Sequence, residues 1–121
     1  GKKIFDNPKS VSLLMRIINF AAQDDDCIIL DYFSGSATTA HAVMEINATL
    51  GAHKKCIMVQ LQEPTDEKSP AYKAGYKNIC EIGKERIRKA AELIKQTYPG
   101  SKFDEGFRVL KLDSAASVVY S

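Results

Sequence analysis

The chain has 121 residues, of which 45% are hydrophobic, and this length and composition suit one folded domain with its own core. The formal charge is only +2, so the composition does not indicate a strongly polyanion-binding protein. We see neither a signal peptide nor an apolar run of transmembrane length, which favours a cytoplasmic protein without a membrane partner.

The cysteines and histidines do not predict a metal site or a disulfide framework. Cys27, Cys56 and Cys80 lie far apart, and two of them stand in apolar runs, which is typical of reduced, buried thiols. His41 and His53 have no partner at metal-ligand spacing. We therefore expect neither a bound metal nor a cross-link.

The amino-terminal part predicts an extended segment and then an amphipathic helix. Asn7 precedes Pro8 and is biased away from helical geometry, and Asn7 or Ser10 can cap the helix that follows. Apolar residues then recur at helical spacing until about residue 23, namely Val11, Leu14, Ile17 or Ile18, and Ala21. The acidic turn at residues 24–26 lacks the spacing of a calcium loop.

Residues 27–46 form the unit around which the rest of the chain is organised. Residues 27–30 predict a buried strand that ends at Asp31, and a loop of small residues around Gly35 follows. Thr38 and Thr39 then open a helix, whose inward positions are expected at Thr39, Ala42, Val43, Ile46 and Leu50. A strand, a glycine turn and a helix in this order present a helix amino terminus to a ligand.

The following segments predict two more strands and one long helix. Gly51 ends the central helix, residues 56–61 read as a second strand joined by a right-handed crossover, and residues 64–75 as a surface loop. A helix is expected from about residue 76 to 97, and residues 107–112 alternate as a third strand would. The inward helix positions are Ile79, Ile82, Ile87, Ala90, Ala91 and Ile94.

The other face of this helix carries most of the charge of the segment. Two interpretations stay open, a solvated face with local ion pairs and a surface for the DNA backbone. The residues assigned to this face are Lys77, Lys84, Glu85, Arg86, Arg88, Lys89, Glu92 and Lys95.

These elements predict an α/β fold with a mainly parallel sheet that is open on one side, as in a piece of a larger doubly wound domain. Ligands of such sheets bind at the carboxyl ends of the strands, where Asp31, Gln60 and Glu63 stand. Gly35 allows close approach of the backbone, and Gln60 and Glu63 follow it by twenty-odd residues, as a ribose-binding residue would. The pattern indicates a cofactor that contains adenosine.

Three cofactor sites compete on the residues alone. A phosphate-binding loop is a poor match, because no Gly-Lys-Ser/Thr follows the glycine. A relaxed dinucleotide motif, Gly35-x-Ala37-x-x-Ala40, places a methyl group where the pyrophosphate passes. S-adenosylmethionine has no pyrophosphate, so its site does not need a bare middle position.

Two motifs resemble those of the amino-methylating DNA methyltransferases. Residues 30–43, Leu-Asp-Tyr-Phe-Ser-Gly-Ser-Ala-Thr-Thr-Ala-His-Ala-Val, resemble their cofactor motif, Asp-x-Phe-x-Gly-Ser-Gly-Thr-Thr. Upstream, residues 5–10, Phe-Asp-Asn-Pro-Lys-Ser, resemble their Asn-Pro-Lys-Pro/Ser segment. Further stretches, at residues 57–61, 71–76, 79–87 and 106–113, look like the modification subunit of type III restriction-modification systems.

The resemblance implies a partial Rossmann-like methyltransferase fold in one domain over residues 4–121, which binds S-adenosylmethionine. The implied enzyme methylates DNA, with adenine favoured over cytosine, beside a restriction subunit and a second modification subunit. The catalytic Asp/Asn-Pro-Pro-aromatic tetrapeptide of the family is absent from this sequence, so we expect the chain alone to transfer no methyl group. Ala37 replaces the usual second glycine, and Gln60 stands where relatives often have an acid.

The resemblance also assigns roles to individual residues. Phe33 would pack on the cofactor, Gln60 and Glu63 would bind the ribose, and Lys9 would pair with the methionine carboxylate. The methionine moiety would be framed by Asp31, Gly35, Ser36, Thr38 and Thr39, with Asn7, Lys9 and Ser10 near its end.

Simpler roles stay open for several of these residues. The plain alternatives are Phe33 as a core aromatic, Ser36 or Thr38 as a helix cap, Lys9 as a surface lysine, and Glu63 as a solvated acid. His41 is expected to be a satisfied helix histidine. At the level of function, the alternatives are a domain that binds another nucleotide, such as NAD, and a non-catalytic interaction module.

Overall fold

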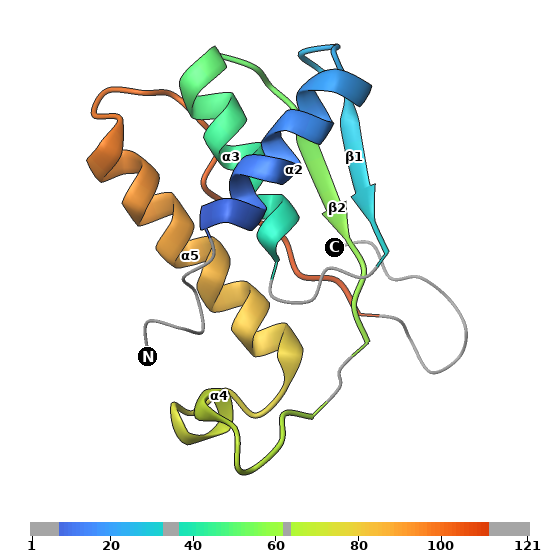
Figure 1. Ribbon diagram of the computed structural model, residues 1–121, viewed down its shortest axis with the longest axis vertical. Helices are drawn as coiled ribbons and strands as arrows, with labels where there is room; N and C mark the ends of the chain where they lie inside the picture. Colours follow the sequence, from blue (N-terminus) through green and yellow to red (C-terminus); the bar gives the residue numbers. More distant parts are fainter. Residues whose placement is uncertain (1–7, 33–36, 62–63, 112–121) are drawn as a thin grey trace.

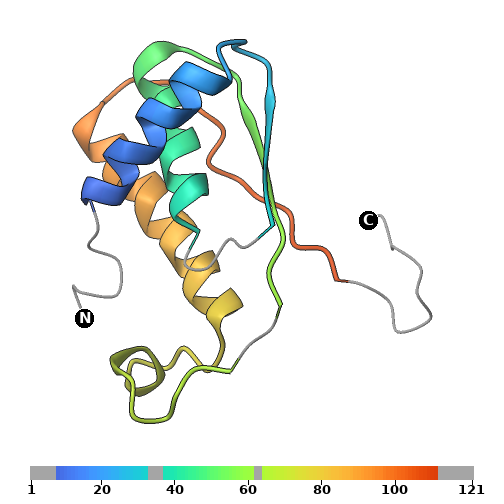
Figure 2. The same ribbon diagram turned by 45° about the vertical axis from the view of Figure 1, so that its right-hand side comes forward.

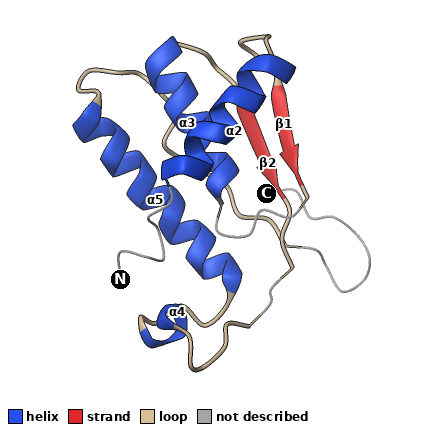
Figure 3. Cartoon of the chain, viewed as in Figure 1, coloured by secondary structure: helices blue, strands red, loops and turns tan. Residues whose placement is uncertain are grey.

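A computed structural model describes residues 8–32, 37–61 and 64–111 of the chain. The elements in chain order are α2 (Pro8–Ala21), β1 (Ile28–Asp31), α3 (Thr38–Leu50), β2 (Lys55–Met58), α4 (Pro70–Lys73) and α5 (Ile79–Thr97) (Figure 1). The two strands pair in parallel, with Ile29 opposite Cys56 and Asp31 opposite Met58. The expected α/β class is confirmed as a mixed fold in which helices accompany a small parallel sheet (Figure 3).

Local hydrogen bonds explain where the helices begin and end. Gly51 ends α3 as expected, since it adopts a left-handed conformation with φ 69° and its N–H donates to the carbonyl of Asn47 at 3.1 Å. Asn78 starts α5, because its side-chain oxygen accepts from the N–H of Glu81 at 3.0 Å. This cap explains why α5 begins later than the residue 76 that the sequence predicts.

Two clusters of buried side chains hold the helices and the sheet together. Figure 2 shows the arrangement of the helices beside the two strands. One cluster joins α3 to α5 and includes Met44, Ile87 and Ile94. The other joins α2 to α3 and to the inner face of the sheet, where Ile29 and Cys56 pack against it. Helix α3 therefore lies at the centre of the fold, with a different set of side chains directed to each neighbour.

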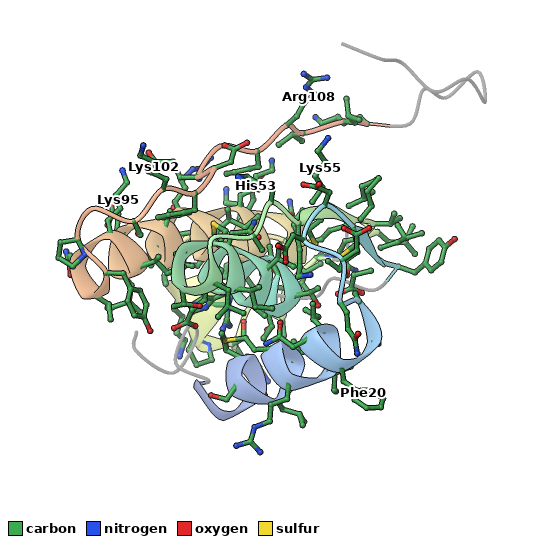
Figure 4. All side chains as sticks on the ribbon, turned by 90° about the horizontal axis from the view of Figure 1, so that it is seen from above. Phe20, His53, Lys55, Lys95, Lys102 and Arg108 are labelled. Atoms are coloured by element: carbon green, nitrogen blue, oxygen red, sulfur yellow. The ribbon has the colours of Figure 1, made fainter. Side chains whose placement is uncertain are left out.

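The third strand expected at residues 107–112 is a wrong prediction within the described part. Residues 107–111 belong to no strand, and residue 112 lies outside the described ranges. Phe107, Val109 and Leu110 are all about half exposed, so apolar positions of both alternation phases face solvent. Alternation predicts a strand only where a neighbouring strand accepts its backbone hydrogen bonds. Figure 4 places Arg108 of this segment on the side of the molecule away from Phe20 of α2.

Three further expectations need correction. The second strand ends at Met58 rather than near residue 61, and Leu50 is exposed rather than inward. The loop expected at residues 64–75 contains the short helix α4, which Ser69 caps by accepting from the N–H of Tyr72. The three cysteines are free thiols, but each is of intermediate burial, so the expectation that they are buried is wrong.

One face of the sheet has no covering layer among the described residues. Ile28, Leu30 and Ile57 alternate with the inward Ile29 and Cys56, and their side chains are about half exposed. In the described ranges, no helix is long and apolar enough to cross a membrane.

Candidate functional site

Helix amino ends and strand carboxyl ends face the same end of the molecule. The amino ends of α2, α3 and α5 and the carboxyl ends of β1 and β2 point in the same direction (Figure 1). Helix amino termini carry partial positive charge and N–H groups without intrahelical acceptors. This end of the fold therefore favours a ligand with a negatively charged group.

Two predicted site residues are joined directly at this end. Thr39, in the first turn of α3, donates its hydroxyl hydrogen to a carboxylate oxygen of Asp31, the last residue of β1, at 2.7 Å. A hydrogen bond to an ionised acceptor is stronger than a neutral one, so it fixes the start of α3 to the end of β1. The Asp31 carboxylate also lies near Cys56. Burial first, and this negative charge second, raise the pKa of that thiol to about 11.

Ala37 starts α3 in a backbone geometry that usually belongs to glycine. Its φ is 65° and its ψ is 34°, which is the left-handed region, and its side chain is 2% exposed. The residue offers no side-chain acceptor to the first amides of the helix. Thr38 is the first helical residue rather than the cap, so its interpretation as a helix cap is wrong.

Gln60 lies at the same edge of the sheet as Asp31. It follows β2 by two residues, and Asp31 is opposite Met58, the last residue of that strand. Its side chain is half-buried, and the amide nitrogen donates to the carbonyl of Leu61 at 3.2 Å. The structure thus brings together Asp31, Thr38, Thr39 and Gln60 at the carboxyl edge.

Ser10 lies within α2 rather than ahead of it. The helix begins at Pro8, as a proline in the first turn allows, so the expectation that Ser10 caps it is wrong. The structure does not describe the side chain of Lys9. Other predicted site residues fall outside the described ranges, and their roles stay predictions: Asn7, Phe33, Gly35, Ser36 and Glu63.

Arg86 occupies a position that the sequence predicts wrongly. The pattern places it on the outer, charged face of the long helix, yet it is 3% exposed, and its Nη2 lies 3.4 Å from Nδ1 of His41. Burial, and then the charge of Arg86, lower the pKa of His41 to about 4. The signal was present, since Ile82 and Ala90, each one turn away from Arg86, are inward residues.

A second buried polar group was also missed. Asn47 and Lys54 are both buried, and the Asn47 side chain bonds to the main-chain N–H and carbonyl of Lys54. Lys54 in turn donates from Nζ to the carbonyls of Ala22 and Asp24, each at 2.7 Å. In the part of the chain that the structure describes, no group of three His, Cys, Asp or Glu side chains could hold a metal ion.

Comparison with known proteins gives a consistent set of relatives. The family model described as DNA methylase matches residues 1–96. The Mod subunit of the type III restriction-modification enzyme StyLTI from Salmonella typhimurium (strain LT2) is 41% identical over 108 residues, which are 89% of this chain and 16% of that protein. The EcoP15I Mod subunit from Escherichia coli is 40% identical over 108 residues, 89% of this chain and 15% of that protein.

A relative of another restriction-modification type matches as well. The type II methyltransferase M.KpnI from Klebsiella pneumoniae is 36% identical over 103 residues, which are 85% of this chain and 24% of that protein. The chain therefore spans less than a quarter of the length of each of these three relatives.

Proposed function

Since this chain belongs to the DNA methylase family, we propose that it is the S-adenosylmethionine-binding part of a DNA methyltransferase of the type III restriction-modification kind. Two Mod subunits at about 40% identity, each aligned over 89% of the chain, support the type III assignment. In a Rossmann-like domain of this kind, further elements would cover the exposed sheet face at Ile28, Leu30 and Ile57.

The observation that carries the proposal is the hydrogen bond from Thr39 to Asp31 at the carboxyl edge of the sheet. It fixes a carboxylate beside the amino end of α3, where a ligand with both cationic and anionic groups finds both complements. S-adenosylmethionine has such groups, a sulfonium with an ammonium and a carboxylate. Ala37 leaves the first amides of α3 without a side-chain cap of its own, which suits a ligand carboxylate there.

In this proposal the chain binds and orients the cofactor. Asp31 balances its positive charge, the amino end of α3 receives its carboxylate, and Gln60 hydrogen-bonds the ribose diol, more weakly than a carboxylate would. Lys9 and Ser10 of α2 approach the methionine end, together with Asn7, Phe33, Gly35, Ser36 and Glu63. When bound, S-adenosylmethionine supplies a methyl group on a sulfonium, which leaves readily, so the protein contributes mainly proximity and alignment.

The substrate and the partners follow from the relatives and the motif resemblance. The substrate would be the exocyclic amine of an adenine in DNA, flipped out of the duplex toward the cofactor. The partners would be a restriction subunit and a second modification subunit. The residues that bind the flipped base are expected outside this chain, because the Asp/Asn-Pro-Pro-aromatic tetrapeptide is absent from it.

Amide NMR of the 121-residue chain tests the proposal, with S-adenosylmethionine, NAD and ATP titrated separately. We expect selective, saturable shifts at Asp31, Thr38, Thr39 and Gln60 with S-adenosylmethionine only. Thr39→Val removes the hydroxyl that bonds Asp31 and should weaken binding about tenfold, the effect of losing roughly 1.5 kcal/mol. Thr49→Val is the matched control, because Thr49 lies on the same helix and its hydroxyl bonds only to the preceding turn, at Glu45 and Ile46.

Two results would contradict the proposal. Selective shifts with NAD or ATP at the same residues would favour the alternative of another nucleotide. Equal affinity of the Thr39→Val and Thr49→Val variants would remove the role of the Asp31–Thr39 pair. A separate transfer assay with radiolabelled cofactor and DNA addresses activity. We expect no transfer by this chain alone, and N6-methyladenine as the product of a longer polypeptide that carries it.

A further inference from the structure

The buried polar side chains of the described ranges differ in how completely they are hydrogen-bonded. Asn47 and Lys54 both satisfy main-chain partners at 2.7 to 3.0 Å. Arg86 is the most buried of the three, at 3% exposed, and its Nε has no hydrogen-bond partner among the described residues. Buried polar groups without partners are rare in folded proteins, so the guanidinium of Arg86 stands out as incompletely hydrogen-bonded.

The positive charge of Arg86 also lacks a counter-charge in the described ranges. The ion pairs found there involve other residues, and none includes Arg86. The ring of His41, which Arg86 contacts, is neutral at physiological pH, because its pKa is lowered to about 4. An isolated buried charge is costly unless an anion and hydrogen bonds compensate it.

A cavity lies where such an anion would sit. It has a volume of about 80 Å³ and is lined by His41, Arg86, Lys89, Ala90 and Leu93. One water molecule occupies about 30 Å³ in the liquid, so a small organic anion fits. Two cationic side chains border the cavity, and the side chains of Ala90 and Leu93 provide apolar walls.

We propose that this α3–α5 cavity binds a carboxylate that carries a short hydrocarbon stem. The two carboxylate oxygens match the N–H groups at the end of the Arg86 guanidinium, which lines the cavity, whereas Nε is sealed from it. The stem packs on Ala90 and Leu93. A strongly hydrated ion such as phosphate has no apolar part that could contact these two side chains. The carboxylate comes either from an Asp or Glu side chain outside this chain or from a free short-chain acid.

The cavity is distinct from the proposed cofactor site. His41 follows Thr39 by two residues on α3, and two residues of a helix differ in direction by about 200°. Thr39 faces Asp31 at the sheet, whereas His41 faces α5 through Arg86. The inference therefore does not rest on the proposed function, and S-adenosylmethionine should not displace the carboxylate.

The test uses the 121-residue chain with 15N-labelled arginine and follows the Nε–H signals during titration with sodium butyrate. We expect a saturable shift of the Arg86 signal, while the exposed Arg88 on the same helix does not shift. Sodium chloride at matched ionic strength should have no effect. Formate, which has no stem, should bind at least about tenfold more weakly than butyrate, because each of the three extra carbons strengthens binding up to about fourfold when it is buried.

Two variants test separately the positive charge of Arg86 and the apolar side chain of Leu93. Arg86→Met should abolish the binding, and Arg88→Met is the matched control. If Arg86→Met does not fold, Leu93→Ser decides, since it should remove the preference for butyrate over formate. The proposal is overturned if the Arg86 shift grows linearly with concentration, if chloride reproduces it, or if inorganic phosphate binds as tightly as butyrate.

A thermal-shift comparison identifies the source of the carboxylate. Butyrate should raise the melting temperature of the isolated chain. If it has no effect on a longer polypeptide that carries the chain, a side chain of that polypeptide already fills the cavity. If it raises the melting temperature of both, the ligand is a free acid. A lack of effect on the isolated chain overturns the proposal.

Discussion

Replacing Asn47 with alanine is expected to destabilise the chain, because its side chain joins α3 to the segment that leads into β2. The side-chain amide donates to the carbonyl of Lys54 at 2.9 Å, and its oxygen accepts from the N–H of Lys54 at 3.0 Å. Both residues are buried, at 7% and 6% exposed, so water cannot easily replace the lost partner. The pair fixes β2 beside β1, and with it the edge of the candidate cofactor site.

The magnitude follows from the two groups that would be left unsatisfied. Each buried main-chain group without a partner costs about 1–3 kcal/mol, which gives roughly 2–6 kcal/mol for both. Alanine favours the helix by about 0.6 kcal/mol over asparagine, so the net loss is about 1.5–5 kcal/mol. Since domains of this size are stable by about 5–15 kcal/mol, the variant should still fold.

Equilibrium urea denaturation at 25 °C, followed by circular dichroism, measures this loss. The midpoint should fall by about 1 M or more with little change in slope. Asn19→Ala is the matched control, because Asn19 is exposed on α2 and its replacement should stabilise slightly through helix propensity. If the two variants differ by less than about 0.5 kcal/mol, the Asn47 bonds do not stabilise the fold as reasoned.

Three further outcomes are expected. With the other two cysteines replaced by serine, alkylation of Cys56 should be about 100-fold slower at pH 8 than that of a free thiol, because its pKa is raised from 9.0 to about 11; a normal rate would contradict its burial. The unfolded chain should bind a proton at His41 near pH 6.5 and the folded chain only near pH 4, so the free energy of unfolding should fall as pH drops through this window. The His41→Gln variant should lose this pH dependence of the free energy of unfolding, whereas the His53→Gln variant should keep it. Denaturation of both variants at pH values between 4 and 7 measures the difference. Gly51→Ala should cost about 1 kcal/mol through its φ of +69° alone, since an added Cβ meets no atom within 4 Å; unchanged thermal stability would argue against the left-handed cap.

Helical periodicity predicted the central helix well. Residues 38–50 form the expected helix, and Ala42, Val43 and Ile46 are buried as expected. The same reasoning failed for Arg86, because α5 is inclined across α3 and a charged side chain one turn from two buried residues is buried with them. The spacing of apolar residues in one sequence identifies which face of a helix is buried. It does not show how many residues at the border of that face are buried with it.

Strand prediction was limited for a different reason. A strand of the sheet is defined by its hydrogen-bonded neighbour, and alternation at residues 107–111 says nothing about whether that neighbour is present. The candidate site was predictable in part, since Asp31 and Thr39 do meet at the carboxyl edge. Their direct hydrogen bond could not be read from the sequence, because it depends on how closely α3 returns to β1.

The left-handed conformation of Ala37 bears on how this family can vary. An alanine at φ 65° is less stable than a glycine there by about 1–2 kcal/mol, whereas burial of its methyl group, 2% exposed, contributes about 0.8 kcal/mol. The second term offsets much of the first, so an exchange of alanine for glycine here changes folding stability by about 1 kcal/mol or less. Folding stability therefore selects only weakly between alanine and glycine at this position. The choice between the two residues then depends on how closely a bound molecule approaches the start of α3.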